Sequence, residues 1–152
     1  MSQEEQYGTR GLEYSAWHRR LSTQRFVGIE NAQLLAMIDL DIALYVEYEE
    51  SSKKPVGLVE VAQDIGQTKK VATVTQKLAE MAGIPAYVVL YKISDDKNPA
   101  DGKWNDISNF RVKRLTPQPE QEWRNMSPEE YAINLLKLRR FVCDKFDQQG
   151  NK

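Results

Sequence analysis

Two apolar runs joined by a polar turn constrain the fold of this chain more than any other feature. Residues 37–47 alternate apolar side chains with others, which is the pattern of a β-strand with one buried face. A polar turn at residues 49–55 follows, and residues 56–64 return as a second apolar run. The pattern predicts two antiparallel strands joined by a hairpin.

Acidic residues occupy one side of this predicted hairpin. Asp39 and Asp41 lie on the face opposite the apolar one, and Glu60 and Asp64 share a face of the second strand. Two carboxylates in an apolar strand repel each other and lose hydration unless a positive charge neutralises them, so a hard divalent cation is the simplest neutraliser. Two alternatives remain open: the aspartates could be hydrogen-bonded to turns at a strand end, and Glu60 could pair with a lysine across the strands.

The middle of the chain predicts a strand, a helix and a strand. Residues 69–82 have helical periodicity and Gly83 follows them, whereas residues 85–93 are apolar nearly throughout, as in a strand that is covered on both faces. A helix between two strands of one sheet predicts a parallel crossover. We expect the helix to bury an apolar stripe formed by Val71, Val74, Leu78, Met81 and Ala82.

The flanking regions give simpler signals. Residues 12–21 predict a short helix after a polar tail. Residues 95–109 are rich in turn formers and predict an exposed loop, and residues 110–116 alternate as an edge strand with a basic outer face. A capping box with a proline at the first helical position begins a helix over about residues 127–146.

Length and composition indicate one soluble domain. The chain has 152 residues, of which 41% are hydrophobic, so we expect a single domain over residues 1–152 with loose ends at 1–10 and 148–152. The 21 basic and 22 acidic residues balance, which argues against a protein that simply coats DNA. The single cysteine, Cys143, favours a reducing, cytoplasmic compartment. No signal peptide or membrane-spanning run is visible, so no membrane partner is expected.

The order of these elements and acidic residues resembles the PD-(D/E)xK nuclease superfamily, whose fold is called restriction-endonuclease-like. The resemblance covers about residues 12–93. The motifs YSxWHR at 14–19, IDLD at 38–41 and PVGLVE at 55–60 are similar to those of small nuclease-like proteins of bacteriophages. The resemblance implies an α/β fold with a mixed central sheet flanked by helices.

The same resemblance implies a metal-dependent deoxyribonuclease, an endonuclease encoded by a phage and acting in the host cytoplasm. Asp41 and Glu60 would bind Mg²⁺ or Mn²⁺, with Asp39 as a second carboxylate or as an alternative to Asp41. Such cations prefer oxygen ligands, and magnesium keeps several waters that can supply the nucleophile for phosphodiester hydrolysis. DNA is therefore the expected substrate, and a homodimer would suit cleavage of both strands of a duplex.

One position departs from the superfamily pattern. The superfamily lysine lies two residues after the glutamate, where this chain has Ala62. Lys70 is the preferred substitute, because it lies four and eight residues before Val74 and Leu78 on the predicted helix and hence on the face toward the sheet. The alternative is a catalytically inactive nuclease-fold module that binds DNA or a host protein. A third reading, unrelated to nucleases, is a small structural α/β protein.

Further residues would complete the site. The candidate accessory residues are Glu13, His18, Gln63 and Asp64, and the candidates for binding the DNA backbone are Arg19, Lys69 and Arg111. Glu13 would be the acidic residue that the first helix contributes in many members of the superfamily. His18 could equally pack beside Trp17, and Lys69 with Lys70 could form no more than a solvated start of a helix.

Overall fold

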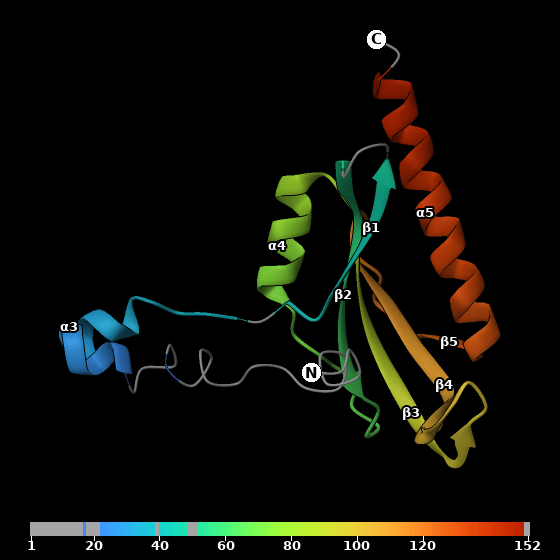
Figure 1. Cartoon of the computed structure of the whole chain (residues 1–152), viewed down its shortest axis with the longest axis horizontal. Coiled ribbons are helices and arrows are strands. Elements are labelled where there is room, and N and C mark those ends of the chain that lie inside the picture. Colours follow the sequence, from blue (N-terminus) through green and yellow to red (C-terminus); the bar gives the residue numbers. More distant parts are fainter. Residues whose placement is uncertain (1–16, 18–21, 39, 49–51, 151–152) are drawn as a thin grey trace. The chain divides into compact units, whose positions relative to one another are not determined.

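The computed structural model describes residue 17 and residues 22–38, 40–48 and 52–150 (Figure 1). The chain divides into two compact units, Met1–Asp39 and Leu40–Lys152. The predicted helix at residues 12–21 falls almost wholly outside the described residues. The same holds for the candidate site residues Glu13, His18, Arg19 and Asp39.

The first unit contains helix α3, Ser22–Gln33, which the sequence pattern did not predict. Gly28 interrupts it with a φ of 83°, a left-handed conformation that glycine adopts readily and other residues rarely do. Thr23 and Ala32 are buried, whereas Phe26 and Ile29 are exposed. The helix is therefore two short segments joined at a glycine, which explains why no continuous helical pattern stands out there.

The second unit is an α/β structure built on one mixed sheet of five strands, in the order β1-β2-β3-β4-β5. The strands are β1 Ile42–Tyr48, β2 Ser52–Gln63, β3 Ala86–Asn98, β4 Asp101–Thr116 and β5 Arg124–Met126. Only β2 and β3 run parallel; the other neighbouring pairs are antiparallel. The predicted hairpin and the predicted parallel crossover are both confirmed.

The region after the crossover differs from the sequence-based expectation. Residues 95–109, predicted to be a loop, form the outer part of the long β3–β4 hairpin, which turns after Asn98. Asn98 Oδ1 accepts a hydrogen bond from Ala100 N at 2.9 Å, so the turn formers act only at the tip. The strand predicted at residues 110–116 is confirmed as the end of β4, but its edge position is wrong over Phe110–Val112, where β5 pairs with it.

Helix α4, Thr73–Ala82, packs on one face of the sheet (Figure 1). It begins four residues later than predicted and ends as predicted, with Gly83 in the left-handed conformation at a φ of 70°. The residues that it buries are small: Ala72, Thr75 and Ala79. The predicted apolar stripe is wrong, since its members are exposed, Val71 at 78% and Met81 at 86%. The buried positions each lie one residue further along the helix than a stripe position, so the buried side is the neighbouring one, and its small residues allow the helix to approach the sheet closely.

Helix α5, Pro128–Gly150, packs on the other face of the sheet (Figure 1). Its predicted capping box is confirmed: Glu130 N donates to Ser127 Oγ at 3.1 Å. Val142 packs against Val46 and Val56. At Gly57 the helix comes so close that a Cβ atom would lie 3.0 Å from a methyl carbon of Leu138.

The apolar core lies in layers on the two faces of the sheet. Toward α4 it consists of Leu58, Ala79, Ile84 and Ala86, and on the opposite face it consists of Val59, Val89, Phe110, Val112 and Met126. Neighbouring residues of a strand point to opposite faces, so Leu58 and Glu60 share the α4 face while Val59 takes the other. Among the helices that the structure describes, none is both long and apolar enough to cross a membrane.

Candidate metal and phosphate site

Asp41 and Glu60 meet where the first two strands of the sheet begin to pair. Ile42 is opposite Val59 in the antiparallel register, so the residue before Ile42 faces the residue after Val59. Asp41 Oδ2 also accepts a hydrogen bond from Val61 N at 2.9 Å, which fixes its carboxyl beside β2. The hairpin thus brings together the two residues that the resemblance identified as metal ligands.

Glu60 is a buried carboxyl with only 8% of its surface exposed. Thr75 Oγ1 on α4 donates a hydrogen bond to Glu60 Oε2 at 3.0 Å. Burial raises the pKa of Glu60, the Thr75 hydrogen bond lowers it, and the charge and hydrogen bonding of Asp41 raise it further. The net shift is upward. Negative charge at Glu60 is therefore disfavoured until a cation or a proton neutralises the pair.

Lys70 supplies positive charge to this pair. Its ammonium lowers the pKa of Glu60, although the lysine is exposed and lies three residues before α4 begins at Thr73. The helical argument for Lys70 is therefore wrong, and its role beside the carboxylates stays a prediction that rests on this effect of its charge on Glu60. Lys69 is also exposed and is not among the charges that act on Glu60.

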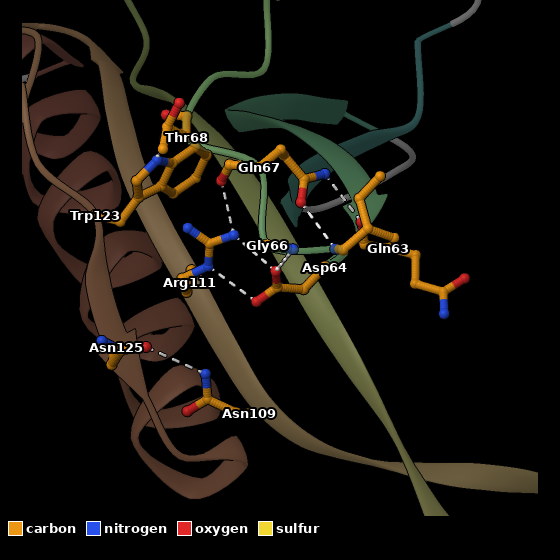
Figure 2. Close-up of polar contacts among 10 residues, drawn as sticks. Gln63, Asp64, Gly66, Gln67, Thr68, Asn109, Arg111, Trp123 and Asn125 are labelled. Atoms are coloured by element: carbon orange, nitrogen blue, oxygen red, sulfur yellow. Dashed lines mark hydrogen bonds and ion pairs between the residues drawn. The ribbon is translucent and has the colours of Figure 1, made fainter.

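A bidentate ion pair supports the segment that carries Lys70, residues 64–72 (Figure 2). Arg111 on β4 donates through Nε to Asp64 Oδ2 at 2.9 Å and through Nη2 to Asp64 Oδ1 at 2.6 Å. These bonds, with one from Gly66 N, hold the pKa of Asp64 down at about 2. The pKa of Arg111 is raised by the same partner. The start of the segment is thus tied across the sheet to β4.

Further bonds continue this support along the segment. Arg111 Nη2 also donates to Gln67 O at 2.8 Å, and Trp123 Nε1 donates to Thr68 O at 2.8 Å (Figure 2). The Trp123 ring lies beneath two cations, with the Arg111 guanidinium 5.2 Å and the Lys113 ammonium 4.7 Å from its centroid. We call these three side chains, Arg111, Lys113 and Trp123, the β4 clamp. The clamp reaches to Thr68, two residues before Lys70.

The β4 clamp changes how two predicted site residues are to be understood. Asp64 and Arg111 engage each other, and the Arg111 side chain is only 17% exposed, so both contribute to support of the segment. Gln63 is exposed and its carbonyl accepts a hydrogen bond from Gln67 Nε2. No sequence signal could reveal the clamp, because it requires the register of β2, β3 and β4 and the position of Trp123 before β5.

The oxygens at Asp41 and Glu60 fit a hard divalent cation. Asp41 Oδ2 accepts from Val61 N and Glu60 Oε2 accepts from Thr75 Oγ1, and the two carboxyls also interact with each other. Magnesium commonly binds proteins through one or two carboxylates while keeping several waters. Among the described residues no group of three or more His, Cys, Asp and Glu side chains gathers.

Comparison with known proteins reveals no relative of this chain. No protein-family model, no curated protein and no solved structure matches it. The functional argument therefore depends on the geometry of Asp41, Glu60 and Lys70.

Proposed function

We propose that this protein is a metal-dependent nuclease that hydrolyses phosphodiester bonds in DNA. One observation carries the proposal: Asp41 and Glu60, acidic residues at the start of two paired strands, lie together, and the charge of Lys70 acts on Glu60. Paired carboxylates beside a lysine offer a cation site next to a positive side chain, which is what a phosphate ester requires.

The role that we propose for each residue follows from its contacts. Asp41 and Glu60 would hold Mg²⁺ or Mn²⁺, which when bound supplies a Lewis acid for phosphate oxygens and activates water. Lys70 would offset the negative charge that develops on the phosphate as the bond breaks. Thr75 positions the Glu60 carboxyl through its hydrogen bond, and Val61 N does the same for Asp41.

The fold supports this proposal. A hairpin that carries the two acids is followed by a helix and by a strand parallel to the second hairpin strand. This is the order that the resemblance to the restriction-endonuclease-like fold requires, and we propose that fold for the second unit.

A second candidate function rests on Ala62. It occupies the position two residues after Glu60 where the superfamily has a lysine, and it is partly buried on β2. If Lys70 does not replace the missing ammonium, the chain is an inactive nuclease-fold module that binds DNA or a protein of the host. The two functions differ in what they require of Glu60, since a binding module tolerates its loss.

The test is cleavage of labelled linear, nicked, branched and single-stranded DNA with Mg²⁺ or Mn²⁺, by the wild type and by Glu60→Gln. The glutamine keeps the shape and can still accept the Thr75 hydrogen bond, but it removes a charged ligand. We expect the rate to fall by at least about 100-fold. Glu47→Gln is the matched control, an exposed glutamate on β1 that we expect to leave the rate unchanged.

Two results would contradict the nuclease. Cleavage that survives Glu60→Gln would place the reaction elsewhere or in a contaminant. Absence of cleavage on every substrate, with DNA binding retained by both proteins, would favour the inactive module.

A further inference from the structure

A cavity of about 390 Å³ lies between the sheet and α5. Its lining includes Val59 from β2, and Val59 points away from the face that carries Glu60. The cavity is therefore separate from the candidate metal site and lies behind it, on the other side of the sheet. Its volume falls within the range of about 300–1,000 Å³ that ligand pockets of proteins occupy.

The inner surface of the cavity is apolar. Val89, Val112 and Met126 come from three different strands and belong to the buried core, and α5 contributes Leu135 and Leu138. An apolar molecule that entered would be removed from water on both sides, by the sheet and by the helix.

The charged side chains of the lining are all cationic. They are Arg114, Arg124 and Lys137, and no aspartate or glutamate lines the cavity. Arg124 is engaged, because its Nε lies 3.0 Å from Glu120 Oε2. Arg114 donates through Nε to Gln118 O at 3.2 Å, which leaves its two terminal nitrogens to bind an anion. Within the described part of the chain nothing bonds the Lys137 ammonium. Two cations are thus available to an anion at the edge of an apolar cavity.

We propose that this cavity binds a small organic anion with an apolar body, of the kind represented by a medium-chain carboxylate. The hydrocarbon would lie against Val89, Val112 and Leu135, and the carboxylate would lie between Arg114 and Lys137. An inorganic anion would leave the apolar surface unfilled, and a neutral hydrocarbon would leave the cations without a partner. The proposal is independent of the nuclease, since no residue of the metal site lines the cavity.

The experiment is a titration of the full chain with octanoate, followed by amide chemical shifts in ¹H–¹⁵N NMR spectra. We expect saturable shifts confined to residues that line the cavity, and an affinity about tenfold lower for the neutral analogue octanamide. Lys137→Gln should weaken the binding of octanoate by a similar factor and leave the binding of octanamide unchanged. Arg139→Gln is the matched control, because it removes the same charge from an exposed position of α5 outside the lining.

Three results would overturn the proposal. The first is the absence of saturable shifts up to about 10 mM octanoate, a range in which a weak pocket would fill. The second is equal affinity for octanoate and octanamide. The third is an equal loss of octanoate affinity in Lys137→Gln and Arg139→Gln. Leu135→Trp, which fills the cavity, should abolish binding while the circular dichroism spectrum stays that of the folded protein. Glu60→Gln should bind octanoate as the wild type does, so failure of the nuclease does not affect this test.

Discussion

Two carboxyls of the same strand region, Asp64 and Glu60, are stabilised in opposite ways. Asp64 receives two bonds from Arg111 and one from a backbone amide, and its pKa falls to about 2. Glu60 is buried beside Asp41 and its pKa rises. A carboxylate that accepts bonds from an arginine and a backbone amide stabilises the fold as an anion, whereas one that is buried against another carboxyl is neutralised by a cation or a proton. The difference supports the functional role that we propose for Glu60, and the bonds of Asp64 give it a structural one.

The largest effect is expected at Lys70. Lys70→Ala should lower the rate of metal-dependent DNA cleavage by about 100-fold, because its charge acts beside Glu60, where it would offset the negative charge that develops on the phosphate. Lys69→Ala is the neighbouring control and should change the rate by no more than about threefold, the effect of one backbone contact. Single-turnover rates at saturating DNA measure both. Equal losses would mean that the two lysines only attract DNA.

The next effect is on stability. Arg111→Gln should lower the free energy of unfolding by about 2 kcal/mol, because Asp64 loses its charged hydrogen-bond partner. Lys113→Gln, which removes only a cation from the same Trp123 ring, should cost about 0.5 kcal/mol. Urea unfolding followed by circular dichroism measures the difference. If both variants lose the same amount, the ion pair contributes nothing beyond the ring contacts.

The fall of the free energy of unfolding at acid pH should depend on Asp64. Its pKa is lowered in the folded state, so its contribution is fully present above about pH 4 and is lost as the pH falls toward 2. The loss is at most about 2.4 kcal/mol, because each unit by which the pKa is lowered corresponds to about 1.4 kcal/mol. Unfolding measured from pH 5 to pH 2 should therefore be steeper for the wild type than for Asp64→Asn. Parallel curves would show that Asp64 gains nothing from Arg111.

The smallest effect is expected from the metal. Mg²⁺ at ten times its dissociation constant should raise the free energy of unfolding by about 1.4 kcal/mol, because it binds the folded state and relieves the repulsion between Asp41 and Glu60. Glu60→Gln should show no such rise, while Asp64→Asn should keep it. Thermal unfolding with and without the metal distinguishes them. A rise in all three proteins would place the cation elsewhere.

Alternation and turn chemistry were enough to predict the centre of the fold. The strand periods around Asp41 and Glu60 predicted the hairpin, and Ser127 with Glu130 predicted the start of α5. These signals are local, so they can be found in a sequence. The β3–β4 hairpin was missed because the residues at 95–109 favour turns, and only pairing between the strands overrides that preference.

The arrangement of the candidate site was predicted only in part. Asp41 and Glu60 were identified correctly as neighbours, but Lys70 was placed on a helix that begins only at Thr73. The buried face of α4 was predicted wrongly because hydrophobic periodicity favoured Leu78 over the smaller Thr75. Of these two residues only Thr75 can donate a hydrogen bond to Glu60. The bonds of Arg111 depend on the alignment of separate strands, which no local pattern encodes.

The missing side chain of Gly57 has an effect beyond its own position. It lets α5 approach β2 at Leu138, which also lines the cavity. On one side of this contact Val142 packs against Val46 and Val56, and on the other side Tyr131 stacks on Phe110. A methyl group at position 57, as in Gly57→Ala, would crowd Leu138 and push the helix away from β2. The space available to a ligand is thus set partly by a residue that no ligand would touch.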